Sequence, residues 1–162
     1  ILYRAGPFQA VGVLLPAASE EELSARVDEI NWGTPGSHPK ADAMADAIRD
    51  YFDGRIAKVS WPPWEWLDFG RLTELERRVL SATAKIPPGR TLSYKELAET
   101  VDRPQAYRFV GTTMAKNPFP VVIPCHRVVR SDRTVGKFGG GPEMKRKMIE
   151  MEASFASRRF TS

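Results

Sequence analysis

Residues 93–117, SYKELAETVDRPQAYRFVGTTMAKN, carry the pattern that decides the fold of the second half of this 162-residue chain. Ser93 and Glu96 have the spacing of a capping box, which predicts the start of a short helix. Residues 102–104 predict a turn, and residues 105–116 predict a second helix. Two short helices around a tight turn form a helix-turn-helix pattern, although an ordinary helical hairpin fits it at least as well.

A further helix is predicted directly upstream of this segment. Thr73 and Glu76 form another capping box, and an apolar stripe with helical spacing follows them. The stripe stops at Pro87-Pro88-Gly89, because proline and glycine both interrupt a helix. The second half of the chain therefore predicts helices joined by tight loops.

The first half predicts a small α/β unit. We expect a strand over residues 8–15, a helix over residues 20–30, a loop over residues 32–39 and a second strand over residues 56–61. A second helix that ends at Gly54 is predicted by the apolar positions Met44, Ile48, Tyr51 and Phe52. The stretch WPPWEW at residues 61–66 predicts an extended connection, because proline removes a hydrogen-bond donor and fixes φ.

The charge of the chain is divided unevenly between these two halves. Residues 1–68 hold 6 Lys and Arg against 11 Asp and Glu, a net charge of −5, whereas residues 69–162 hold 18 against 9, a net charge of +9. The fold class that we predict is α/β (α+β), with a small N-terminal α/β domain over residues 1–68 and a mainly helical C-terminal domain over residues 69–162 that contains the helix-turn-helix. The basic second domain is the one expected to meet a polyanion.

Composition also excludes several classes of protein. One cysteine excludes a disulfide within the chain and any multi-cysteine zinc site, so no metal is expected. No run of about eighteen apolar residues is present, so we expect no membrane span. Residues 1–7 lack the pattern of a signal peptide, so none is expected at this end.

The single cysteine lies in the stretch IPCHRVV, residues 123–129. A free cysteine is most often a buried, unreactive side chain, but two neighbours favour a nucleophile. His126 can accept the proton of the Cys125 thiol, and Arg127 adds a positive charge that favours the thiolate. Cysteine proteases place their cysteine and histidine far apart in sequence, so this adjacent pair predicts a different use of the thiolate.

Four stretches together resemble the O6-alkylguanine-DNA alkyltransferase family. They are NPFPVVIPCHRVV at residues 117–129, IPPGRTLSY at residues 86–94, RFVG at residues 108–111, and the segment from residue 136 to residue 152. The resemblance covers about residues 69–152, and the first 68 residues show no motif of this family. It implies DNA repair by irreversible transfer of an alkyl group, such as methyl, from O6-alkylguanine to Cys125, once per protein molecule.

The resemblance also implies the catalytic residues. Cys125 would be the nucleophile, His126 would take the thiol proton through a water molecule, and Glu152 would be the acidic partner of that histidine. Tyr94 would donate to guanine N3, and Asn117 would tie the active-site turn to the helix-turn-helix. Without the resemblance, we would interpret Glu152 as a solvent-exposed charge on a helix. Tyr94 would be interpreted as an aromatic residue packed on the core, and Asn117 as the C-cap of a helix.

The implied partner is double-stranded DNA that contains O6-alkylguanine, bound through its minor groove with the damaged nucleotide flipped out. Arg108 would fill the vacated position in the base stack. The other DNA-binding residues would be Gly111, Thr112, Thr113, Tyr94 and Arg127, and the substrate pocket would be lined by Pro120, Val128, Phe138 and Gly139. The resemblance implies no cofactor, a monomer, and a location in the cytoplasm at the nucleoid or in the nucleus.

One loop departs from the usual pattern of the family, which often places a tyrosine where this chain has Phe138. Phe138 keeps the ring but lacks the hydroxyl, and Gly139 has no side chain, so we expect an effect on the size of alkyl group accepted.

Two other functions stay open at this point. One is a lesion-binding protein without transfer activity, a class that typically lacks the cysteine; the other is a sequence-specific helix-turn-helix regulator.

Overall fold

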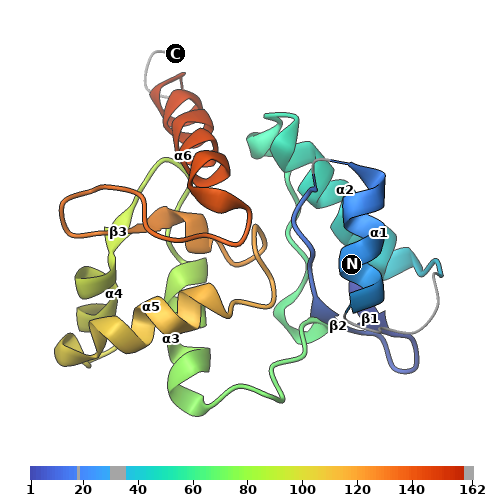
Figure 1. Cartoon of the computed structure of the whole chain (residues 1–162), viewed down its shortest axis with the longest axis horizontal. Coiled ribbons are helices and arrows are strands. Elements are labelled where there is room, and N and C mark those ends of the chain that lie inside the picture. The colour runs from blue at the N-terminus through green and yellow to red at the C-terminus, as the bar shows by residue number, and fades with distance from the viewer. Residues whose placement is uncertain (18, 30–35, 159–162) are drawn as a thin grey trace.

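The computed structural model describes residues 1–17, 19–29 and 36–158, and Figure 1 shows them as two lobes. The first lobe holds β1 (Leu2–Arg4), β2 (Gln9–Gly12), α1 (Glu20–Glu29), α2 (Pro39–Phe52) and the 3₁₀ turns η1 (Ile56–Lys58) and η2 (Trp64–Trp66). The second lobe holds α3 (Glu74–Ala84), β3 (Leu92–Ser93), α4 (Tyr94–Thr100), η3 (Pro104–Ala106), α5 (Tyr107–Ala115), η4 (Cys125–Arg127), β4 (Val128–Val129) and α6 (Gly141–Arg158). This mixed, helix-dominated arrangement with small sheets confirms the predicted fold class.

The first lobe confirms both predicted helices. Helix α2 buries Ala41, Met44, Ala47 and Tyr51 on one face, as the apolar stripe predicted. Helix α1 covers residues 20–29, and residue 30 lies outside the described residues. Of the predicted loop at residues 32–39, residues 32–35 lie outside the described residues, residues 36–38 are not helical, and Pro39 begins α2.

The strands of the first lobe differ from the prediction. The predicted strand over residues 8–15 shortens to β2, which pairs antiparallel with β1, a strand that the sequence analysis missed. The predicted strand over residues 56–61 is wrong, because this segment begins as the turn η1 and has no strand beside it. Apolar residues in a short run indicate burial as readily as they indicate a strand.

The helices of the second lobe begin where their capping boxes place them. The Thr73 hydroxyl accepts from the Glu76 backbone N–H, and the Glu76 carboxylate accepts from the Thr73 N–H; Ser93 and Glu96 repeat the pattern at α4. Helices α4 and α5 pack together around a turn in which Asp102 has a φ of 57°. Helix α5 starts at Tyr107 rather than residue 105, because residues 104–106 form η3.

A two-residue parallel ladder brings β3 and β4 of the second lobe together. Leu92 pairs with Val128, and Ser93 pairs with Val129. Strand β3 leads directly into Tyr94, and strand β4 directly follows the turn that holds Cys125. The ladder therefore places the start of α4 beside the cysteine turn, although about thirty residues of chain separate them.

The two lobes pack against each other through buried apolar side chains. A single cluster contains Phe8, Met44 and Leu67 from the first lobe together with Leu80 and Phe119 from the second. The backbone joins the lobes as well, since the Val13 N–H donates to the Pro118 carbonyl at 2.8 Å. The division at residue 68 into two separate domains stays a prediction.

No helix among the residues that the structure describes is both long and apolar enough to cross a membrane.

The capping box of α3 gives a test of this local architecture. Thr73→Ala should lower the free energy of unfolding by about 1 kcal/mol, because the N–H groups in the first turn lose their acceptor. Urea unfolding measures the change. Ser81→Ala, in the middle of the same helix, is the matched control and should not destabilise the protein; equal stabilities of Thr73→Ala and the parent would contradict the capping interaction.

Candidate active site

Cys125 opens the turn η4 and is 5% exposed. The chain reaches it through a buried loop in which Val121 has a φ of 74°, an unfavourable conformation for a β-branched residue. Asn117 holds this loop in place: its side-chain amide donates to the Ile123 carbonyl at 2.9 Å, and its side-chain oxygen accepts from the Phe119 N–H at 3.0 Å. Asn117 therefore joins the end of α5 to the loop that leads to the cysteine turn.

Three polar side chains surround the cysteine. Burial raises the pKa of the Cys125 thiol, and the Asn117 amide, the charge of Lys145 and nearby backbone N–H groups oppose that rise. Tyr94 interacts electrostatically with Cys125, and its ring centroid lies 5.8 Å from Lys145 Nζ. At rest the thiol is therefore neutral, with a donor and a cation beside it that favour the thiolate once a base removes the proton.

Sequence reasoning missed Lys145. Its Nζ donates to the Val128 carbonyl at 2.6 Å, and burial lowers its pKa to about 8. The available signal was its helical spacing, because Lys145, Met148 and Glu152 form the buried face of α6. Helix α6 carries several other charged residues, so nothing in the sequence indicated that Lys145 would lie on the buried face.

His126 and Glu152 form a buried pair, 0% and 1% exposed. His126 Nε2 lies 2.8 Å from Glu152 Oε1, while His126 Nδ1 is buried without a hydrogen-bond partner among the described protein atoms. Burial lowers the pKa of His126 and acts to raise that of Glu152, but hydrogen bonds from His126 and Arg127 outweigh burial and hold the pKa of Glu152 at about 2. The pair is thus a neutral imidazole beside a carboxylate, with Nδ1 left to accept a proton.

Arg127 takes a different place from the one expected. Its side chain is buried, and it donates to both Glu152 oxygens, from Nε at 2.9 Å and from Nη2 at 2.8 Å, and to the Ile86 carbonyl. The expected contact of Arg127 with DNA does not fit this position, because its donors are used inside the protein. Gly89, with a φ of +80°, adds an N–H to Glu152 Oε2 at 3.2 Å, and a Cβ there would lie 2.6 Å from the Cβ of Ala156.

Sequence reasoning also missed Tyr51. Its hydroxyl donates to Glu152 Oε1 at 2.8 Å and lies 3.1 Å from His126 Nε2. The sequence analysis read Tyr51 only as part of the apolar stripe of α2. Nothing in the sequence connects it to residues of α6, because the contact depends on how the two lobes pack.

The expected DNA-binding residues on α5 divide between surface and interior. Arg108 and Thr112 are exposed and Gly111 is half-buried, so these three are accessible on one side of the helix. Thr113 is 3% exposed and its hydroxyl donates to the Phe109 carbonyl, so it does not fit the expected contact with DNA.

The expected pocket residues lie on several segments around the cysteine turn. Val128 is fully buried, Pro120 and Phe138 are half-buried, and Gly139 is exposed. The loop before Phe138 comes close to Tyr94, since a Cβ on Gly136 would lie 2.5 Å from the Tyr94 hydroxyl. Glycine at residue 136 therefore leaves room for the Tyr94 ring.

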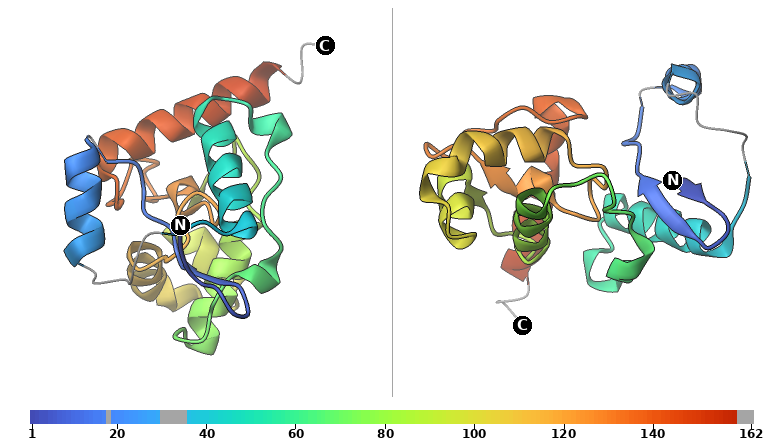
Figure 2. Two further views of the ribbon diagram at one scale, coloured as in Figure 1. Left: turned by 90° about the vertical axis from the view of Figure 1, so that its right-hand side faces the viewer. Right: turned by 90° about the horizontal axis from the view of Figure 1, so that it is seen from below.

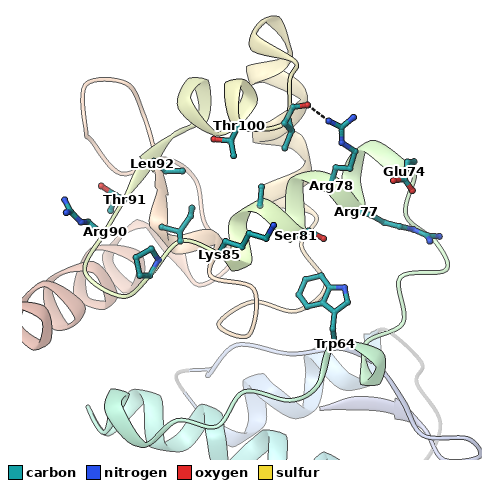
Figure 3. A pocket seen from close by; sticks show the side chains of 14 residues that line it. Trp64, Glu74, Arg77, Arg78, Ser81, Lys85, Arg90, Thr91, Leu92 and Thr100 are labelled. Carbon is teal, nitrogen blue, oxygen red and sulfur yellow. Dashed lines mark hydrogen bonds between the residues drawn. The ribbon is translucent and has the colours of Figure 1, made fainter.

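A groove of about 900 Å³ lies apart from these residues. Figure 3 shows Trp64 on one side of it, facing α3 and the segment that carries Arg90 and Thr91. Cys125, His126 and Glu152 do not line the groove. Among the described residues, no group of three or more His, Cys, Asp and Glu side chains could hold a metal ion.

The buried pair makes stability depend on pH. The folded pKa of His126 is below its ordinary value of 6.5, and that of Glu152 falls from 4.5 to about 2. At pH values between the folded and the unfolded pKa of each group, the unfolded chain binds more protons than the folded protein. The free energy of unfolding should therefore decrease as pH falls below about 6.5 and decrease further below about 4.5. Urea unfolding at several pH values measures this, and His126→Gln should remove the decrease that begins near pH 6.5; an unchanged slope would contradict the assignment.

Comparisons with known proteins agree with this arrangement. Residues 74–154 match the family model described as 6-O-methylguanine DNA methyltransferase, DNA binding domain. The methylated-DNA–protein-cysteine methyltransferase of Methanothermobacter thermautotrophicus is 42% identical over 109 residues, which are 67% of this chain and 59% of that protein. The aligned segment therefore spans less than two thirds of that curated relative.

Solved structures show the same fold. The O6-methylguanine-DNA methyltransferase of Pyrococcus kodakaraensis strain KOD1 superposes with a TM-score of 0.68 at 26% identity, over 93% of this chain and 89% of that one. The Mycobacterium tuberculosis OGT, crystallised in complex with DNA, has a TM-score of 0.61 at 34% identity, over 70% of this chain and 67% of that one. The chain belongs to the 6-O-methylguanine DNA methyltransferase family.

Proposed function

We propose that this protein repairs DNA by transferring the alkyl group of O6-alkylguanine irreversibly to Sγ of Cys125. The observation that carries the proposal is the buried Cys125 with the His126–Glu152 pair beside it, in a chain that belongs to this family. The lesion-binding alternative uses no nucleophile, and it gives no reason for a buried base next to a buried thiol.

The first step creates the nucleophile. A neutral thiol is a weak nucleophile, and burial raises the pKa of Cys125, so the proton has to leave during the reaction. His126 Nδ1 takes it through a water molecule, and Glu152 stabilises the resulting imidazolium. Lys145 and the Asn117 amide stabilise the thiolate that remains.

The second step is an in-line displacement at the alkyl carbon. A bond forms between Sγ and that carbon, the bond from carbon to guanine O6 breaks, and its electron pair stays on the base. Tyr94 donates a hydrogen bond to guanine N3, so the departing base carries its negative charge more easily. The restored guanine takes up a proton from water, and His126 returns the thiol proton to water, so protons and charge balance. The thioether on Cys125 does not hydrolyse, so each molecule reacts once.

Contact with DNA is assigned to the exposed side of α5. Arg108 and Thr112 are accessible there, and the OGT of similar fold has been crystallised in complex with DNA. We place this helix in the minor groove, with the nucleotide flipped toward Cys125 and Arg108 in the space that it leaves. The protein acts as a monomer on chromosomal DNA, at the nucleoid or in the nucleus.

Incubation with a duplex that contains O6-methylguanine tests the chemistry. We expect the peptide that carries Cys125 to gain about 14 Da, the mass of a methylene, with one methyl transferred per protein molecule. Cys125→Ala should transfer none, and mass spectrometry reads both results. Tight binding of the modified duplex without any gain in mass would favour the lesion-binding alternative.

Arg108 gives a separate test of base flipping. Arg108→Ala should slow transfer from duplex DNA by at least about tenfold, because flipping a nucleotide costs a few kcal/mol. The same variant should react normally with the free base O6-benzylguanine, which needs no flipping. Arg49→Ala, an exposed arginine on α2, is the control, and an equal loss on duplex and free base would refute the role of Arg108.

A further inference from the structure

Tyr51 brings the first lobe into direct contact with the His126–Glu152 pair. It lies in the last turn of α2, is fully buried and is 101 residues from Glu152 in the chain. Its ring also packs against His126, with the ring centroids 5.8 Å apart. The Tyr51 hydroxyl thus contacts both the imidazole of His126 and the carboxylate of Glu152.

We infer that Tyr51 is a positioning residue for His126: its hydroxyl sets which imidazole nitrogen accepts the Cys125 proton and the pH range in which it does so. The inference rests on the proposed function for the transfer itself, and it adds a residue from a lobe in which the sequence shows no family motif.

The pattern of donors and acceptors supports this role. Burial and the negative charge of Glu152 raise the pKa of Tyr51, so the hydroxyl keeps its proton and donates it to Glu152 Oε1. The oxygen of the same hydroxyl lies 3.1 Å from His126 Nε2, and its lone pairs are left to accept a hydrogen bond. An N–H at Nε2 therefore has two acceptors, Glu152 Oε1 and Tyr51 Oη, and this holds the imidazole with Nδ1 as the free acceptor.

The same contacts affect the basicity of the imidazole. The charged groups that act on His126 are Glu152, which favours the imidazolium, and Arg127 and Lys145, which disfavour it. Tyr51 carries no charge, but its hydrogen bond draws electron density from the oxygen that His126 also contacts. Without that donor, Glu152 Oε1 attracts the imidazolium more strongly, and a larger fraction of His126 is protonated at neutral pH, where it cannot act as a base.

Tyr51→Phe removes the hydroxyl and keeps the ring. The imidazole pKa of His126, measured by NMR on protein with ¹⁵N-labelled histidine, should rise. The acid limb of the single-turnover transfer rate from an O6-methylguanine duplex should move to higher pH with it. At neutral pH the rate should fall by about tenfold, a part of what acid–base catalysis usually contributes.

Two control variants separate this role from packing. Tyr3→Phe loses the same atom from the same lobe, but Tyr3 packs against Phe8 and His38, away from the pair. Trp61→Phe loosens the packing around Tyr51, whose ring centroid is 6.0 Å away, and leaves the hydroxyl in place. Both variants should keep the parent's His126 pKa and pH profile, even if Trp61→Phe is less stable.

The outcomes are distinct. If the parent transfers the methyl group and Tyr51→Phe matches it in both His126 pKa and pH profile, Tyr51 only packs and the inference is overturned. If the parent transfers nothing, the proposed function fails, and the NMR titration alone decides the role of Tyr51. If Tyr51→Phe does not fold, the ¹⁵N spectrum of the parent decides: a proton on Nε2 supports the inference, and a proton on Nδ1 overturns it.

Discussion

The buried carboxylate of Glu152 is the interaction on which the rest of the site depends. Its two oxygens accept from Arg127, His126, Tyr51 and the Gly89 N–H, so four segments of the chain meet at one negative charge. A buried ion that loses a partner costs the fold about 3–5 kcal/mol, because the remaining charge has no water to solvate it. The carboxylate therefore holds η4, α2, α6 and the backbone at Gly89 in fixed positions relative to one another.

This arrangement explains why Arg127 is buried, although the resemblance to the family implied that it contacts DNA. A guanidinium is the cation best suited to a buried carboxylate, since it donates to both oxygens at once. Burial lowers the pKa of His126, and the positive charge of Arg127 acts in the same direction, so His126 stays neutral, as a base requires. Lys145 supplies a second buried cation, and its charge favours the thiolate of Cys125.

The lobes cooperate more closely than the division of charge along the chain suggested. The acidic first half has no motif of its own, yet it contributes Tyr51 to the pair and Phe8, Met44 and Leu67 to the apolar cluster that both lobes share. The right view of Figure 2 shows the two lobes side by side, and in the left view α6 runs along the upper edge. Because Glu152 and Lys145 both lie on α6, this helix links the carboxylate partner of His126 to the environment of the thiol.

Local sequence determined a large part of this protein. The capping boxes at Thr73 and Ser93, the apolar stripe of α2 and the turn at residues 102–104 predicted their elements correctly, because each signal acts within a few residues. The motif around Cys125 predicted the nucleophile candidate, its histidine and the distant Glu152 through the resemblance to a family. Only the tertiary structure decided that Tyr51 and Lys145 join the site, that Arg127 and Thr113 face inward, and that residues 56–61 form no strand. Those outcomes depend on which faces pack together, and a charged or aromatic residue has the same local pattern whether its neighbour is water or a buried carboxylate.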